Sequence, residues 1–415
     1  ANSSFINRLL DPETDANWLA ENPAIRIEKE KIDIPLPKNI FTERKNSSGF
    51  DLSENSNLEN LEKNISAHKK NKINAESIYM NRDEKGNVGQ KVYSIANNEE
   101  IGTVIFDDPI NVKSTLENFA SKKWSKYSVQ ERSQILIKIS DDIEKDPSEL
   151  IFYLLNEAGK TIQNAIDEIR EAIDFLRYYS RQIIEIHDKK SLQGPTGEIN
   201  KISYSPKGNY LCISPWNFPV AILIGQISAA LVSGNNVVVK PSENTSILGY
   251  LIVKKFHEHG VPIETLQLIL GDGMYGDILT KINTIHGVAF TGSLPTAKKI
   301  QTNLIQHHKE IVPLIAETGG INAMIVDSSA LLEQVTDDVV RSAFDSAGQR
   351  CSALRVLCIQ EEIYDELIKM IKGNMEIQEI GDPNNFSTDI GPIINKHALQ
   401  KLNDYIKGCK ERGME

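Results

Sequence analysis

Residues 209–240 read NYLCISPWNFPVAILIGQISAALVSGNNVVVK, and this stretch decides the fold. A short apolar run, Tyr210–Ser214, leads into a turn with two prolines, and a long apolar segment (219–232) then precedes a second run, Asn236–Lys240. Short apolar runs joined by helix-length segments are typical of parallel strands that are buried on both faces. The stretch therefore predicts a strand–helix–strand unit of an α/β protein.

The same alternation continues along the chain. We expect further strands at Leu266–Leu270, Gly287–Phe290 and Val312–Ala316, and further helices near residues 245–258, 294–307 and 331–346. The pattern predicts a doubly wound parallel sheet, the fold that binds a nucleotide at the carboxyl ends of its strands. Upstream, Asn111–Arg181 has the periodicity of successive amphipathic helices, which indicates packing rather than chemistry.

The length of 415 residues predicts two or more domains, because a single hydrophobic core stops growing below this size. We place a connector arm at 1–95, a nucleotide-binding domain at 96–318 and a catalytic domain at 319–415 that is incomplete at its C-terminal side. Within the arm, Phe41–Asn74 is rich in Asn, Ser, Lys and Glu, a composition that favours loop over core.

The composition narrows the class of partner and compartment. The formal net charge is −11, from 46 basic and 57 acidic residues, which argues against a nucleic-acid surface and favours a small-molecule partner. Four cysteines in so long a chain are too few for a disulfide framework, so we expect a cytoplasmic protein in which Cys212 and Cys358 are buried thiols. The longest apolar stretch, Val220–Val232, is too short to cross a bilayer, and we expect neither a membrane nor a metal partner.

The chemistry points to Cys351, which lies in the sequence GQRCSALR at residues 348–355. Small neighbours let the backbone approach a substrate closely, and a lone carboxylate, Glu317, lies upstream next to two glycines. A thiol nucleophile with an acidic partner is typical of an enzyme that forms a covalent thioester intermediate.

A rigid turn offers an oxyanion donor. In residues 213–219, ISPWNFP, two prolines bracket Asn217 directly after a predicted strand. Such a turn would hold the Asn217 amide in one direction, as a preorganised oxyanion donor requires. Capping of the following helix, with Pro219 in its first turn, explains Asn217 equally well.

The candidate nucleotide contacts also have plainer explanations. Gly271–Gly276 matches the G-x-G-x-x-G pattern but lacks the acidic residue about 20 positions later that would hold a ribose, so a simple glycine turn stays open. Lys240 and Glu243 follow a predicted strand and suit ribose hydroxyls, although exposed loop charges fit the same spacing. The segment Thr291–Ser293 suits a phosphate over helix amides, and Ser293 equally suits a helix cap.

Five of these segments together resemble the NAD(P)-dependent aldehyde dehydrogenase superfamily. They are PWNFP at 215–219, KPSE at 240–243, FTGS at 290–293, ETGG at 317–320 and GQRC at 348–351, in the family's order. The resemblance begins near residue 76 and continues to the last residue. It implies that Cys351 attacks an aldehyde, that the Asn217 side chain and the Cys351 amide hold the oxyanion, and that Glu317 activates the water that releases the acid.

The resemblance also implies a cofactor site and a substrate contact. Glu243 should repel a 2′-phosphate, so NAD is expected rather than NADP, and Ser352 is expected to hold a substrate carboxylate. The expected cofactor contacts are Ile213, Ser214, Pro215, Trp216, Lys240, Ser242, Glu243, Gly273, Phe290, Gly292 and Ser293.

Finer features resemble one branch of the superfamily. Thr318, where most members have leucine, and Ser352-Ala353 look like the enzymes that oxidise L-glutamate γ-semialdehyde to glutamate in proline catabolism. Three arm segments, Asn2–Arg8, Ile34–Pro37 and Glu43–Leu52, look like the connector of bifunctional proline utilization A enzymes. In those enzymes a proline dehydrogenase barrel, which carries FAD, precedes the connector.

This branch implies a homo-oligomer in the complete protein, and no DNA-binding segment can be inferred. Only 64 residues follow Cys351 (415 − 351), whereas a family catalytic domain continues much further. Two alternatives stay open, namely an aldehyde dehydrogenase of other specificity and an inactive nucleotide-binding fragment.

Overall fold

The computed structural model describes residues 10–20, 34–83, 88–188 and 191–414. Its contacts divide the chain into two units, residues 1–48 and 49–415. The described part of the first unit holds a short helix, α2 (Ala16–Ala20), and a 3₁₀ turn, η1 (Pro37–Asn39). The arm segment Asn2–Arg8 lies outside the described residues.

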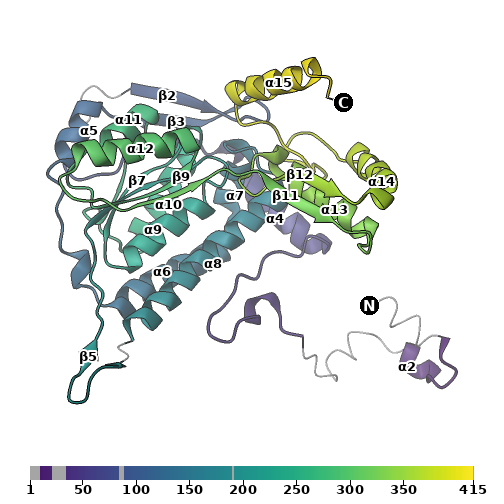
Figure 1. Ribbon diagram of the computed structural model, residues 1–415, viewed down its shortest axis with the longest axis horizontal. Helices are drawn as coiled ribbons and strands as arrows, with labels where there is room; N and C mark the ends of the chain where they lie inside the picture. The colour runs from purple at the N-terminus through teal and green to yellow at the C-terminus, as the bar shows by residue number, and fades with distance from the viewer. Residues whose placement is uncertain (1–9, 21–33, 84–87, 189–190, 415) are drawn as a thin grey trace. The chain divides into compact units, whose positions relative to one another are not determined.

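The second unit is built around a parallel sheet of five described strands. These are β6 (Asn209–Ile213), β7 (Asn236–Lys240), β8 (Leu266–Leu268), β9 (Gly287–Gly292) and β10 (Leu314–Thr318), in the spatial order β10-β9-β6-β7-β8. The chain starts at the central strand β6, adds β7 and β8 on one side, and then returns to add β9 and β10 on the other (Figure 1). This is the doubly wound order, whose ligand crevice lies where the direction reverses, between β6 and β9.

Helices cover both faces of this sheet, which confirms the predicted class. One face carries α11 (Gly273–Leu279), α12 (Leu294–His307) and α5 (Pro109–Leu116), and the other carries α9 (Ala221–Val232) and α10 (Ser246–Glu258) (Figure 1). Two apolar clusters fill the spaces between the sheet and these two layers of helices. The strands read as continuous apolar runs because each is buried on both sides, and all of β7 is buried.

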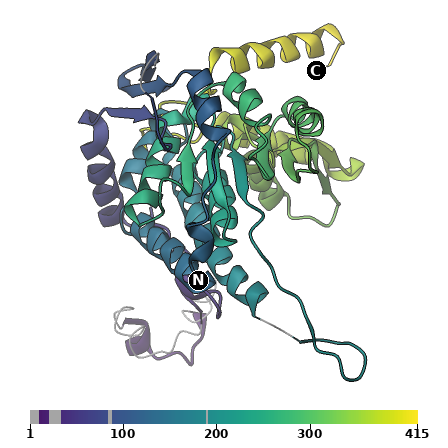
Figure 2. The same cartoon turned by 90° about the vertical axis from the view of Figure 1, so that its left-hand side faces the viewer.

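The helices predicted upstream pack behind α9. They are α6 (Val129–Lys145), α7 (Ser148–Asn156) and the long α8 (Ile162–His187), and the 3₁₀ turn η3 (Trp124–Lys126) precedes them. On α6 the apolar side chains Leu136, Ile139 and Ile143 are buried and Ile135 is partly buried, and on α8 Ile166, Ile169, Ile173 and Leu176 are buried. A hairpin formed by β4 (Ser191–Leu192) and β5 (Asn200–Lys201) follows α8 and extends away from the sheet (Figure 2).

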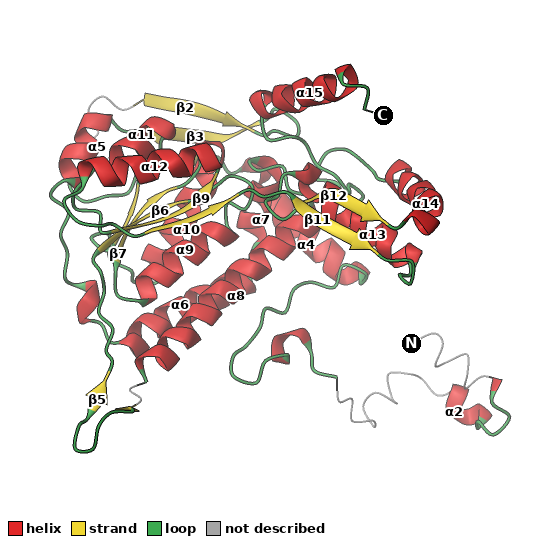
Figure 3. Ribbon diagram, in the orientation of Figure 1, coloured by secondary structure: helices red, strands yellow, loops and turns green. Residues whose placement is uncertain are grey.

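A second, smaller core lies beyond β10. The parallel pair β11 (Asn322–Val326) and β12 (Leu354–Ile359) packs against α13 (Leu332–Phe344) and α14 (Tyr364–Glu376), as Figure 3 shows. The 3₁₀ turns η5 (Asp345–Gly348) and η6 (Glu361–Ile363) flank β12, and α15 (Lys396–Glu411) comes last. The interior of this core includes Val326, Val339, Leu354, Leu367 and Ile371.

The expectation of loop across Phe41–Asn74 is wrong for its central part. Residues 55–67 form helix α4 (Asn55–Ala67), whose Leu61 and Ile65 are buried against the main core. The 3₁₀ turn η2 (His68–Lys70) and a three-stranded sheet follow, made of β1 (Ile73–Glu76), β2 (Val88–Tyr93) and β3 (Glu100–Phe106) in the order β1-β3-β2. These two apolar residues, one helical turn apart, pack the helix against the core, although the polar composition of the segment favours a loop.

The prediction that Cys358 is buried is also wrong, whereas Cys212 is fully buried as expected. In β12 the side chains alternate, so Leu357 and Ile359 pack on the small core while Val356 and Cys358 face away from it and are exposed. An apolar run predicts burial on both faces, but in this two-stranded sheet the small core covers only the face that carries Leu357 and Ile359.

Candidate active site

The strand registers bring three predicted cofactor residues to one edge of the sheet. Ile213 at the end of β6 pairs with Lys240 of β7 and, on its other side, with Phe290 of β9. The segments that follow these strands therefore meet at the reversal point of the sheet. A cavity of about 320 Å³ lies there, and all eleven residues expected from the sequence line it, from Ile213 to Ser293.

Lys240 is the principal charge of this cavity. Its side chain is 5% exposed, its Nζ donates to the carbonyl oxygen of Pro241 at 3.1 Å, and it lies 3.9 Å from the Glu243 carboxylate. Burial lowers the pKa of Lys240, and the nearby charges of Glu243 and Asp272 oppose that shift. The reading of Lys240 as an exposed loop charge is therefore wrong, whereas Glu243 is half exposed.

Two features of the cavity suit a polar, phosphate-bearing ligand. Ser214 is 3% exposed, and its Oγ has no hydrogen-bond partner within the described residues, so this buried group at the cavity wall suits a ligand. The N-terminus of α12 also faces the cavity, where free backbone amides favour a phosphate. Ser293 caps this helix by accepting from the Thr296 amide at 3.3 Å, so the capping explanation is correct and does not remove Ser293 from the wall.

The predicted nucleophile lies between η5 and β12, three residues after a strained segment within η5. Cys351 is exposed, and it follows three successive residues in the left-handed region: Ser346 (φ 53°), Ala347 (φ 55°) and Gly348 (φ 68°). A side chain disfavours this conformation, which costs about 1–3 kcal/mol and persists only where the surroundings enforce it. Strain of this kind next to a thiol is the pattern expected for a site rather than for packing.

Asn217 contacts this segment. Its Nδ2 donates a hydrogen bond of 3.0 Å to the backbone oxygen of Gln349, two residues before Cys351. The capping alternative is wrong, because α9 starts at Ala221 and its cap position, Val220, makes no side-chain cap. An amide nitrogen carries two hydrogens, so Asn217 keeps a second N–H that this hydrogen bond does not use.

Two further residues of the site were missed from the sequence. Asn322 donates from Nδ2 to the backbone oxygens of Cys351 (2.7 Å) and Ala353 (2.9 Å), and so fixes the chain on both sides of Ser352. Gln349 donates to the Ser346 oxygen at 3.0 Å and accepts from the Ile394 amide at 3.0 Å. The only signal for Asn322 in the sequence is its place two residues after the Gly319-Gly320 pair.

Glu317 lies on β10, at the same edge of the sheet as the cavity. It pairs with Thr291 of β9, and its neighbour Thr318 pairs with Gly292, so the carboxylate-bearing end of β10 adjoins the cavity wall. Glu317 is exposed, as is Ser352 beside the thiol. The roles of Cys351, Asn217, Glu317 and Ser352, and of the eleven cavity residues, remain predictions.

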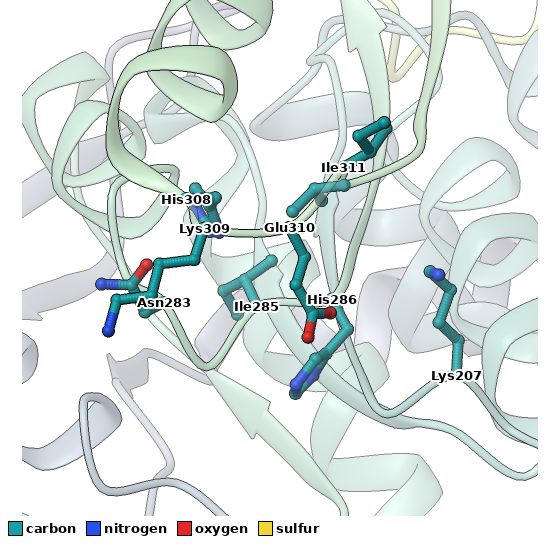
Figure 4. Close-up of a pocket in the computed structure, with 9 residues that line it drawn as sticks. Lys207, Asn283, Ile285, His286, His308, Lys309, Glu310 and Ile311 are labelled. Carbon is teal, nitrogen blue, oxygen red and sulfur yellow. The ribbon is translucent and has the colours of Figure 1, made fainter.

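A separate cavity of about 250 Å³ lies at the opposite, amino edge of the sheet (Figure 4). It is formed by the segments that precede β6, β9 and β10, and its wall includes Lys207, His286, His308 and Glu310. His286 accepts from the Asn209 amide and His308 contacts the Thr280 oxygen, so both rings already serve the fold. This cavity is remote from the thiol.

Comparison with known proteins supports the family resemblance that the sequence motifs indicate. Residues 82–415 match the model of the aldehyde dehydrogenase family. The chain belongs to this family. Within the described residues, no helix is long and apolar enough to span a membrane, and no three His, Cys, Asp or Glu residues gather as metal ligands.

The similar proteins include PutA proteins and 1-pyrroline-5-carboxylate dehydrogenases. The bifunctional protein PutA of Salmonella typhimurium is 38% identical over all of this chain, which covers 32% of that protein. The 1-pyrroline-5-carboxylate dehydrogenase of Geobacillus kaustophilus is 35% identical over 71% of this chain and 58% of its own length. A structure of proline utilization A with proline bound in remote sites has a TM-score of 0.81 at 38% identity, covering 99% of this chain and 40% of that one. This chain thus spans about a third of the length of its PutA relatives.

Proposed function

We propose that this protein oxidises L-glutamate γ-semialdehyde to L-glutamate with NAD, through a thiohemiacetal and then a thioester on Cys351. One observation carries the proposal. Trp216 lines the cavity proposed for the cofactor, and the adjacent Asn217 is hydrogen-bonded to the segment that bears the thiol. Nucleophile, oxyanion donor and cofactor cavity are therefore contiguous.

The chain's own groups supply the covalent chemistry. The Cys351 thiolate forms a bond to the aldehyde carbon, and the carbonyl oxygen becomes an oxyanion that accepts from the free Asn217 N–H and the Cys351 backbone N–H. When bound, the dinucleotide supplies the acceptor for the hydride that leaves this carbon. Glu317 then takes a proton from water, the hydroxide adds to the thioester, and the carbon–sulfur bond breaks to release the acid and the thiolate.

The cavity favours NAD over NADP. Glu243 lies next to Lys240 in the wall, where ribose hydroxyls can donate to the carboxylate, and a 2′-phosphate there would meet like charge. The family as a whole uses either dinucleotide, so the preference rests on this one carboxylate.

The substrate assignment rests on the relatives. The Salmonella PutA and the Geobacillus 1-pyrroline-5-carboxylate dehydrogenase are 38% and 35% identical to this chain where they align, and Ser352 next to the thiol supplies a hydroxyl for a substrate carboxylate. In this assignment the protein carries out the second step of proline catabolism.

We extend the proposal to location and assembly. All four cysteines are free, which suits a reducing cytoplasm. The β4–β5 hairpin and the irregular segment that follows it expose Ile199, Ile202 and Tyr204, and a second copy of the protein would cover such side chains. Light scattering on the complete natural protein tests this point, and a monomer would contradict it.

The decisive experiment compares substrates. The complete natural protein is assayed for NADH formation with glutamate γ-semialdehyde and with unbranched aliphatic aldehydes of similar length. We expect kcat/KM for the semialdehyde to be at least about 100-fold higher, because a carboxylate-binding site rejects a substrate that leaves its polar groups unpaired. Equal or higher kcat/KM for the aliphatic aldehydes would overturn the substrate assignment.

A further inference from the structure

A buried ion pair connects helix α8 to both halves of the candidate site. Lys160 lies just before α8 and Glu168 within it, with Nζ 3.4 Å from Oε2 and side chains only 4% and 0% exposed. Burying two charges costs more than their attraction returns unless further contacts satisfy them. The other contacts of Lys160 and Glu168 therefore indicate what this buried pair does in the structure.

Lys160 contacts the nucleophile segment and the oxyanion turn at once. Its Nζ lies 3.4 Å from the hydroxyl of Ser346, and 3.9 Å from the centre of the Phe218 ring. Ser346 opens the left-handed segment that leads to Cys351, and Phe218 follows Asn217. An ammonium over an aromatic face is attracted to it, most strongly when water is excluded.

Glu168 holds the other end of the oxyanion turn. Its Oε1 accepts from the backbone amides of Val220 (2.8 Å) and Ala221 (3.3 Å), where α9 begins. These amides have no partner within the helix, so the carboxylate satisfies them and fixes where the turn ends. The ion pair thus holds the 217–221 segment on one side and Ser346 on the other.

The nucleophile segment needs such support. Ser346 and Ala347 both have positive φ, which side chains disfavour, and the Ser346 hydroxyl donates to Asn164 of α8 at 2.8 Å. Asn164 is 4% exposed and Ser346 is 8% exposed, so this contact is made away from water. A strained segment keeps its conformation only when its neighbours over-determine it.

We propose that Lys160, together with Asn164 and Glu168, is a positioning residue that sets the nucleophile segment against the Asn217 turn, so that thiol and amide meet the same carbonyl. The effect on turnover rests on the proposed aldehyde oxidation, whereas the effect on the geometry of Cys351 does not. Removing the ammonium releases Ser346 and Phe218 and leaves Glu168 without its cation.

The test is the substitution Lys160→Met in the complete natural protein, which keeps the length of the side chain and removes its charge. We expect kcat to fall about 10- to 100-fold, since small displacements of reacting groups have effects of this size. The dissociation constant for NAD should stay within twofold, because Lys160 does not line the cofactor cavity. Lys160→Arg, which keeps the cation, should recover at least a third of the wild-type kcat.

A second measurement needs no substrate. Iodoacetamide labelling followed by peptide mass spectrometry reports Cys351 separately from the exposed Cys358, which serves as an internal reference. In Lys160→Met the labelling rate of Cys351 relative to Cys358 should change at least threefold, because the nucleophile segment loses a contact that fixes its conformation. If the protein fails to oxidise the semialdehyde but this ratio changes, the proposed function fails and the positioning role stands.

The matched control is Arg177→Met, which removes a buried cation from the same helix. Arg177 is 2% exposed and pairs with Asp141 and Glu144 rather than with the site. It should lower the melting temperature and leave the labelling ratio and kcat within twofold. If Lys160→Met does not fold, Ser346→Ala replaces it, with an expected three- to tenfold loss of kcat. Unchanged kcat and labelling in the folded variant, or equal losses in Arg177→Met, would overturn the inference.

Discussion

Replacing Asn217 by alanine should separate catalysis from stability. The side chain donates a 3.0 Å hydrogen bond to the Gln349 oxygen, and its second N–H is the proposed oxyanion donor. Loss of a neutral hydrogen bond destabilises a fold by about 0.5–1.5 kcal/mol. Loss of an oxyanion donor raises the reaction barrier by about 2.7–4 kcal/mol, or about 10²–10³ in kcat. Asn217→Ala should therefore lose far more turnover than stability.

The assay pairs steady-state kcat with the free energy of unfolding, measured by urea denaturation. Asn322→Ala is the matched control, because Asn322 makes two hydrogen bonds to the same segment, at 2.7 and 2.9 Å, and has no proposed role at the oxyanion. We expect Asn322→Ala to lose at least as much stability as Asn217→Ala but less than tenfold in kcat. The reasoning is refuted if Asn217→Ala keeps kcat within about threefold, or if the two variants lose kcat equally.

Three further substitutions test other parts of the account. Glu317→Gln should slow hydrolysis of the thioester by about 10²–10⁴, so stopped-flow absorbance should show an NADH burst before a slow steady state; a uniform slowing without a burst would contradict the role of general base. Glu243→Gln should raise kcat/KM with NADP relative to NAD by roughly tenfold. The substitution removes the repulsion between the carboxylate and the 2′-phosphate, which is worth about 1 kcal/mol per pair of unit charges near 4 Å in water. An unchanged ratio would show that this carboxylate does not select the cofactor. Glu157 is fully buried, and burial raises its pKa from 4.5 to about 8, although hydrogen bonds from the amides of Ile247 and Leu248 oppose this shift. Between pH 4.5 and about 8 the folded state therefore binds more protons than the unfolded state. Stability should therefore fall as pH rises from about 5 to 8, and Glu157→Gln should flatten that slope in urea denaturation; parallel slopes for the two proteins would show that another group is responsible.

The central sheet was predictable because its strands are buried on both faces. Continuous apolar runs identified β6 and β7 to within a residue, and the alternation with helices gave the doubly wound class. The last strand was placed two residues early, at 312 rather than at Leu314. Pro313 explains the error, because a proline has no N–H for the ladder and only its oxygen pairs, accepting from Val288.

The contacts that hold the candidate site were not predictable. Asn217 and Gln349 are separated by 132 residues, and Lys160 and Ser346 by 186, so no local pattern joins them. The sequence pointed to residues with the right chemistry, but the support comes from side chains such as Asn322 and Asn164, whose roles depend on the packing of distant elements. The exposed Cys358 is a second example, because the sequence of a strand does not show whether another element covers its second face.

The central claim is that Cys351 carries the acyl group. The most direct measurement mixes Glu317→Gln, in the complete natural protein, with NAD and glutamate γ-semialdehyde, quenches in acid and maps the adduct by peptide mass spectrometry. We expect the acyl mass on the peptide that contains Cys351, and no adduct in the double variant with Cys351→Ala. An adduct on another residue, or undiminished turnover in Cys351→Ala alone, would contradict the covalent mechanism.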